Sequence, residues 1–147
     1  MVLRDTARTM SQENVEIVRK SLQAFLENDF EGWFAVTDPG CRLYPRPEEP
    51  GVRECYEGWD EILEYLVNWY SGWKEYTTEP ERFIDAGDWV VVEVNEVGIA
   101  ESGLRVEQRF AHAFKVENGK GVEWRMFGPV EEAFEALGLS AQDARSS

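Results

Sequence analysis

The segment from Arg105 to Leu139 reads RVEQRFAHAFKVENGKGVEWRMFGPVEEAFEALGL. Polar and apolar residues largely alternate on both sides of Asn118-Gly119, a dipeptide that strongly favours a tight β-hairpin turn. We therefore predict two antiparallel strands over 104–116 and 122–127. The only histidine of the chain, His112, lies in the middle of the first strand among aromatic residues, which locates a candidate pocket.

Upstream of this hairpin, the spacing of apolar residues predicts helices followed by strands. Apolar residues recur at helical spacing after Ser11, a good helix-capping residue, and again from Trp59 to Tyr70. Beyond Trp73 the pattern changes to the alternation typical of strands. The predicted helices cover 11–27, 30–36, 59–70 and 131–137, and the other predicted strands cover 41–44, 74–84 and 89–97.

Two stretches rich in turn-forming residues separate these elements. Thr37-Asp38-Pro39-Gly40 is a strong turn signal that should end the second helix. Residues 45–51 contain three prolines, so we predict a loop here, at the rim of a pocket. Arg46 and Arg53 flank this loop, where they either meet a ligand carboxylate or are simply solvated.

Helices first and an antiparallel meander afterwards predict an α+β fold. In it, a curved and mostly antiparallel sheet wraps the N-terminal helices and leaves a cavity on its concave side. With 147 residues, the chain is long enough for one domain around one core. We place this domain at 11–139, after a flexible N-terminal extension over 1–10 and before a flexible tail over 140–147.

The composition narrows the classes of partner. A formal net charge of −14 repels polyanions, so nucleic acid is not expected as a partner. No apolar run approaches the roughly 18 to 20 residues of a membrane span, and the N-terminus lacks the apolar core of a secretory signal. We therefore expect a cytoplasmic protein that does not bind membranes.

Cys41 and Cys55 are expected as reduced thiols, with a disulfide between them as the alternative. Without CxxC or HxxxH spacing, no metal or other cofactor is predicted.

Three segments of the chain resemble one known family. SQENVEIVRKSLQAFLENDFEGWFAVTDPGCRLYP (11–45), YEGWDEILEYL (56–66) and EQRFAHAFKVENGKGVEWRMF (107–127) are similar, in this order, to the SnoaL-like branch of the nuclear-transport-factor-2-like superfamily. The resemblance spans residues 11–139 and implies a cone-shaped roll with a pocket. In this superfamily the pocket serves polyketide cyclases, ketosteroid isomerases, epoxide hydrolases, dehydratases and binding proteins without catalysis.

The resemblance also suggests roles for single residues. His112 lies where the ketosteroid isomerases carry a protonated Asp that donates a hydrogen bond to a substrate oxygen. The carboxylate base of those enzymes is replaced here by Tyr44. Where epoxide hydrolases have an Asp, Met126 follows Trp124-Arg125. Steroid isomerisation and epoxide hydrolysis are therefore disfavoured.

Alternation along the last strands sorts their side chains, because residues two apart share a face. The inner face should carry Gln108, Phe110, His112, Phe114, Val116, Trp124 and Met126. The outer face carries opposite charges that can pair across the sheet, and it is either solvated or the interface of a homodimer. These outer charges are Glu107, Arg109, Glu123 and Arg125. Glu93, an acid on the preceding strand, is also placed outward, where an ion pair is its expected role.

Two functions stay open for the pocket. The first is binding of a small hydrophobic or aromatic molecule, with His112 making one hydrogen bond. The second is a cofactor-independent cyclase, isomerase or dehydratase, with His112 as acid or base and Tyr44 assisting. A second titratable group beside His112 would favour the enzyme, whereas a histidine buried in solid packing would exclude both. The predicted ligand-binding residues are Tyr44, Trp59, Tyr65, Trp69, Phe110, His112, Trp124 and Met126.

Overall fold

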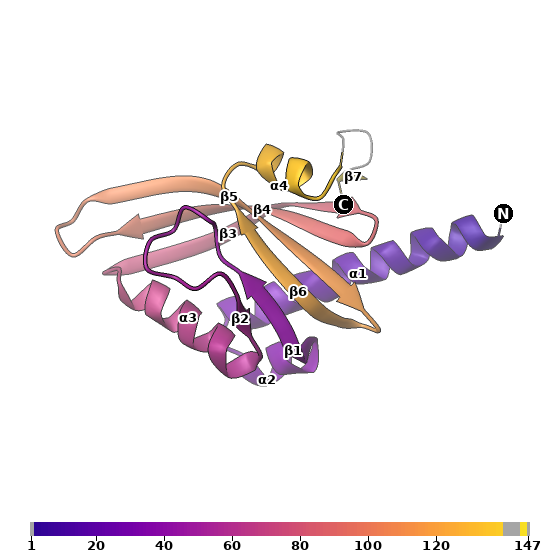
Figure 1. Ribbon diagram of the computed structural model, residues 1–147, viewed down its shortest axis with the longest axis horizontal. Coiled ribbons are helices and arrows are strands. Elements are labelled where there is room, and N and C mark those ends of the chain that lie inside the picture. Colours follow the sequence, from indigo (N-terminus) through magenta and orange to yellow (C-terminus); the bar gives the residue numbers. More distant parts are fainter. Residues whose placement is uncertain (1, 140–144, 147) are drawn as a thin grey trace.

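A seven-stranded sheet in the order β2-β1-β6-β5-β4-β3-β7 forms the centre of the fold (Figure 1). The computed structural model describes residues 2–139 and 145–146, with side chains over 11–139. Neighbouring strands are antiparallel except β1 and β6, which pair in parallel. The strands are β1 Thr37–Tyr44, β2 Tyr56–Glu57, β3 Glu75–Ala86, β4 Trp89–Ile99, β5 Arg105–Glu117, β6 Lys120–Phe127 and β7 Arg145–Ser146. The helices are α1 Val2–Leu26, α2 Phe30–Ala35, α3 Trp59–Ser71 and α4 Val130–Ala136.

The main core lies between the concave face of the sheet and the helices α1 to α3. Figure 1 shows the sheet twisting around α1, with α2 and α3 on the same side. Apolar residues of α1 belong to one buried cluster with residues of β4, β5 and β6, as the helical and strand periodicities require. Its members include Val15, Val18, Leu22, Val90, Val92, Phe114 and Trp124. The α+β fold predicted from the sequence is therefore confirmed.

The helix α4 covers part of the outer face of the sheet. Ala133 of α4 is fully buried against a second cluster that includes Val91, Ala111 and Ala113. The two strand alanines have small side chains, which let the helix approach the sheet closely. The outer face is thus apolar where α4 lies and charged elsewhere.

The first helix begins at Val2, and the start predicted at Ser11 is wrong. Residues 2–10 contain neither Pro nor Gly and include Leu, Arg, Ala and Met, which favour helices. Nothing in this stretch therefore interrupts the helix, and the extension predicted as flexible is helical from Val2 onwards. Figure 1 shows this end of α1 projecting beyond the sheet.

The turn predicted at Thr37-Asp38-Pro39-Gly40 lies inside β1 instead of before it. Thr37 pairs with Gly121 of β6, but the next paired residue of β1 is Arg42, opposite Glu123. The turn-forming residues are absorbed as a bulge, in which the Asp38 carboxylate accepts a hydrogen bond from the Gly40 amide at 2.8 Å. A strand can contain this motif because the bulge leaves the extra residues unpaired.

The C-terminal residues and the outer charges also depart from prediction. Arg145 and Ser146 pair with β3, whereas the rest of the predicted tail lies outside the described residues.

On the outer face of the sheet, β6 ends at Phe127 opposite Ala111, so Glu107 and Arg109 of β5 extend past it and cannot pair with the charges of β6. The ion pairs are instead Arg109–Glu81 at 2.9 Å, Arg105–Glu107 at 3.0 Å, and Arg125 with Glu123 on the same strand. Dimer formation through this face stays a prediction.

Because Gly98 of β4 has no side chain, a cluster of aromatic rings can pack directly on the sheet there. A Cβ atom at this position would lie 2.5 Å from Cε3 of Trp73. The Trp73 ring packs in turn on Trp69 and Tyr76, with centroid distances of 6.0 and 5.4 Å. The missing side chain at Gly98 therefore positions rings that lie beside the pocket described below.

We expect Gly98→Ala to lower the free energy of unfolding by about 1–3 kcal/mol, because the added methyl group displaces Trp73 from a packed cluster. Urea unfolding followed by far-UV circular dichroism measures this change. Gly121→Ala is the matched control, since its Cβ would meet nothing nearer than 3.7 Å and should change stability by no more than about 0.5 kcal/mol. Equal effects of the two substitutions would contradict this account.

Candidate functional site

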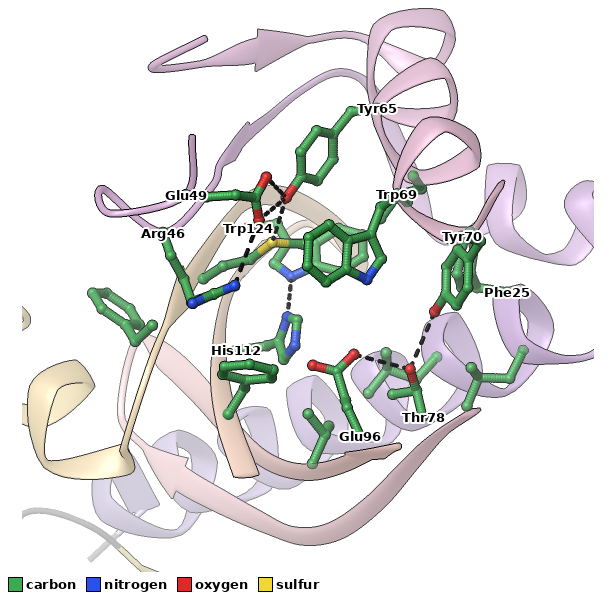
Figure 2. A pocket seen from close by; sticks show the side chains of 17 residues that line it. Phe25, Arg46, Glu49, Tyr65, Trp69, Tyr70, Thr78, Glu96, His112 and Trp124 are labelled. Atoms are coloured by element: carbon green, nitrogen blue, oxygen red, sulfur yellow. Dashed lines mark hydrogen bonds and ion pairs between the residues drawn. The ribbon is translucent and has the colours of Figure 1, made fainter. Parts of the chain in front are cut away.

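A narrow pocket lies on the concave side of the sheet, between the helices and strands β3 to β6 (Figure 2). The loop over 45–51 contributes Arg46 and Glu49 to its wall. The centre of a water molecule can occupy about 50 Å³ of it. Its wall is mostly apolar, with a few polar groups, and is formed by Leu22, Phe25, Leu26, Arg46, Glu49, Tyr65, Leu66, Trp69, Tyr70, Thr78, Val94, Glu96, Phe110, His112, Trp124, Met126 and Phe127.

Most of the residues predicted to bind a ligand meet in this pocket. Those that line it are Tyr65, Trp69, Phe110, His112, Trp124 and Met126. Trp59 does not, because its ring packs on Phe34 at a centroid distance of 4.5 Å. The indole nitrogen of Trp59 donates a hydrogen bond to the Thr37 carbonyl at 3.0 Å. Trp59, at the start of α3, thus links this helix to β1.

Tyr44 lies on the opposite side of the sheet from His112. It pairs with Arg125 of β6, and the Arg125 guanidinium lies over its ring at 4.7 Å. The adjacent pair, Leu43 and Trp124, points into the core. Tyr44 lines a separate outer groove, in which the centre of a water molecule can occupy about 500 Å³. The assisting role predicted for Tyr44 therefore does not fit this arrangement.

Within the described residues, the His112 side chain forms one hydrogen bond, and the direction of that bond fixes the protonation of the imidazole. Nε1 of Trp124 donates to Nδ1 of His112 at 2.8 Å (Figure 2). An indole nitrogen only donates, so Nδ1 must carry no proton, and the neutral imidazole has its proton on Nε2. Among the described residues, Nε2 of His112 has no hydrogen-bond partner. The pocket therefore presents an N–H donor that a ligand can use.

The imidazole of His112 stays neutral at pH 7. Burial lowers its pKa from 6.5 to about 4, and the positive charge of Arg46 acts in the same direction. The residue is only 8% exposed, so little water is available to solvate an imidazolium. His112 is thus a hydrogen-bond donor near neutrality and not a cation.

Glu96 is a second titratable group in the same pocket, and sequence reasoning missed it. Its Oε1 accepts a hydrogen bond from the Thr78 hydroxyl at 3.0 Å, and the Tyr76 hydroxyl also bonds to the carboxylate. Because Thr78 uses its only proton there, the Tyr70 hydroxyl at 3.2 Å must donate to Thr78. Burial raises the pKa of Glu96, although both hydroxyl contacts oppose the shift. Figure 2 shows Glu96 and His112 pointing into one cavity.

A signal for Glu96 was present in the sequence. It continues the alternation of Val90, Val92 and Val94, so it shares their inner face. Glu93, the acid considered from the sequence, does lie outward and pairs with Arg82 at 3.1 Å. Continuing the same alternation by two residues, from Val94 to Glu96, would have placed this acid on the inner face.

The proline-rich loop closes one side of the pocket through Glu49. The Tyr65 hydroxyl lies 2.9 and 2.8 Å from the two carboxylate oxygens of Glu49 and donates to them. Nη2 of Arg46 lies 3.8 Å from Oε1 of Glu49, and the Arg46 guanidinium lies over the Phe110 ring at 4.4 Å. The Glu49 side chain is only 6% exposed, and burial raises its pKa. These contacts hold the loop against α3 and β5.

In the described part of the chain, no group of three or more His, Cys, Asp or Glu side chains is arranged to hold a metal ion. No helix within the same residues is both long and apolar enough to span a membrane. Cys41 and Cys55 are free thiols.

Comparison with known proteins gives one family and several similar structures. A model of the SnoaL-like domain family matches residues 18–124. TerC, co-crystallised with polyporic acid, is 22% identical with a TM-score of 0.70, covering 86% of this chain and 98% of that one. An NTF2-like protein from Burkholderia thailandensis is 25% identical with a TM-score of 0.70, covering 84% and 95%. A protein from Jannaschia sp. CCS1 assigned as a SnoaL-like polyketide cyclase is 18% identical with a TM-score of 0.63, covering 88% and 94%. No curated protein matches the sequence.

We expect the stability of the protein to fall as pH decreases from about 6.5 to about 4, through His112. In this window the unfolded chain binds a proton that the native imidazole, with its lowered pKa, does not, and the full effect is roughly 3 kcal/mol. His112→Gln is the reference, because its amide oxygen can still accept from Trp124 but does not titrate. The difference in unfolding free energy between the two proteins, measured by urea titration at several pH values, isolates His112 from Glu49 and Glu96. Parallel pH profiles would show that burial does not shift this pKa.

Proposed function

This chain belongs to the SnoaL-like domain family, and we propose that it binds a small, mostly apolar molecule whose oxygen atom accepts a hydrogen bond from Nε2 of His112. The observation that carries the proposal is the Trp124–His112 hydrogen bond, which leaves the Nε2–H without a partner among the described residues. His112 lines the pocket, so a ligand oxygen that enters can accept the hydrogen bond this group offers. Rings around the donor supply the apolar contact that pockets of this kind offer.

The size of the pocket limits the ligand. Its free space, about 50 Å³, is well below the several hundred Å³ of most ligand pockets, so the ligand is compact or side chains at the wall move. Four residues line both this pocket and the outer groove and so separate the two spaces: Arg46, Glu49, Met126 and Phe127. Displacing them would join the spaces. The co-crystal of TerC with polyporic acid is consistent with a small-molecule ligand in this fold.

A second candidate function is acid–base catalysis, and Glu96 is the observation that favours it. A carboxylate with a raised pKa and a neutral N–H donor line the same pocket, which are the two groups needed to remove a proton beside a carbonyl and hold the resulting oxyanion. In this reaction Glu96 would take the proton, and His112 would bind the oxygen. Similar structures assigned as a polyketide cyclase and as an isomerase from Bacillus subtilis are consistent with such chemistry.

We expect acetophenone to bind more tightly than α-methylstyrene, in which a methylene group replaces the carbonyl oxygen. One neutral hydrogen bond contributes about 0.5–1.5 kcal/mol, so the ratio of dissociation constants should be about 2–10. Nitrogen-15 NMR titration measures both, and the single histidine makes the Nε2 signal unambiguous. In His112→Phe the two compounds should bind alike, while Tyr44→Phe, outside the pocket, should keep the preference. An unchanged Nε2 signal at saturation would contradict the proposal.

If the protein is also an acid–base catalyst, it should exchange the methyl protons of acetophenone for deuterium in D₂O faster than buffer does. Mass spectrometry of the recovered ketone measures this rate. Glu96→Gln should slow the exchange about 100-fold or more, because it removes the base. Glu93→Gln, on the outer face of the same strand, should not change it. Exchange at the buffer rate in the wild type would remove the enzyme hypothesis and leave binding unaffected.

A further inference from the structure

Glu96 is the one charged group of the pocket that forms no ion pair with a described side chain, and Arg46 acts on it only at longer range, lowering its pKa slightly against the effect of burial. The lining residues that carry charge are Arg46, Glu49 and Glu96, because His112 is neutral. Arg46 has Glu49 as its partner in the wall, at 3.8 Å. Glu96 receives hydrogen bonds from hydroxyl groups and forms no ion pair with a described residue. The pocket as a whole therefore carries one uncompensated negative charge.

Hydroxyl donors satisfy the hydrogen-bonding capacity of Glu96 in part, but they do not cancel its charge. A carboxylate removed from water without a counter-charge destabilises the native state, and the raised pKa of Glu96 has this cause. A neutral ligand hydroxyl could add another hydrogen bond. A cation would cancel the charge as well, so it gains more from the same position.

Aromatic rings surround this carboxylate. Tyr76, which bonds to Glu96, meets Trp69 and Tyr70 edge to face, with centroid distances of 5.7 and 5.2 Å. Trp69, Tyr70 and Phe25 also line the pocket (Figure 2). Rings attract cations through their faces, and a carboxylate among rings is the combination that recognises ammonium groups.

We propose that the ligand of this pocket carries a protonated amine that pairs with Glu96 among the rings of Trp69, Tyr70 and Phe25. This inference rests on the binding function proposed above, and it names the chemical class of the ligand. The amine lies at the Glu96 end of the pocket, and the rest of the molecule extends towards His112, where any acceptor atom that it carries faces Nε2. The narrow free space favours a compact aromatic or alicyclic amine.

The test compares benzylammonium with benzyl alcohol, which has nearly the same shape but no charge. NMR titration at pH 7 gives both dissociation constants, and the His112 Nε2 signal reports whether each compound enters the pocket. The wild type should prefer benzylammonium by about tenfold, the effect of one hydrogen bond to a charged group. Glu96→Gln should lose this preference and still bind benzyl alcohol.

Glu93→Gln separates a local contact from the general attraction of an acidic protein. It removes the same charge from the same strand but on the outer face, so it should keep the tenfold preference. An equal loss in Glu93→Gln and Glu96→Gln would overturn the inference. Equal dissociation constants of the wild type for benzyl alcohol and benzylammonium would also overturn the inference, although the binding function itself would stand. If neither compound moves the Nε2 signal, the binding function fails together with the inference.

Discussion

The hydrogen bond from Trp124 to His112 determines which hydrogen-bonding group the imidazole presents to the pocket. The two residues are diagonal neighbours on the inner face of β5 and β6, since Phe114 pairs with Trp124 and His112 pairs with Met126. The register of this hairpin thus brings an obligate donor to one nitrogen of the imidazole. Because Nδ1 accepts, the proton is on Nε2, and burial keeps the ring from gaining a second one. A one-residue slip in register would turn one of the two rings to the outer face and break this hydrogen bond.

The same alternation explains which parts of the fold and site could be predicted from sequence. The order of helices and strands, and the inward position of Phe110, His112, Trp124 and Met126, follow from periods that are local in the chain. Tyr44 was misplaced because the face of a β1 residue depends on a bulge and on parallel pairing with β6. Neither is visible in local sequence. The start of α1 was missed for a related reason. A favourable capping residue such as Ser11 does not stop a helix from extending further towards the N-terminus.

The loop over 45–51 shows the limit of sequence reasoning most clearly. Its prolines predict irregular backbone, and the structure has a loop there. They do not predict that Glu49 turns inward, because its partner Tyr65 lies on α3 and is recognised only after the helix has packed on the sheet. Buried acids in loops are decided by such long-range contacts. The outer groove and the inner pocket are consequently separated in part by Arg46 and Glu49, two side chains of this loop that no local pattern places at the pocket.

The loop over 45–51 connects two properties of the pocket: its small free volume, and the polar groups in it that lack a partner of opposite charge or a hydrogen-bond partner within the described part of the chain. Glu49 is held by Tyr65 and Arg46, whereas among the described residues Glu96 has hydroxyl donors but no ion pair, and Nε2 of His112 has no hydrogen-bond partner. A ligand that opens the wall must break contacts at Glu49, and the measured affinity will be reduced by that cost. It can recover the cost only where the free protein is unsatisfied, at Glu96 and His112. Under the proposed binding function, compact molecules that reach both groups should therefore gain most, whereas larger apolar molecules must open the loop without compensation.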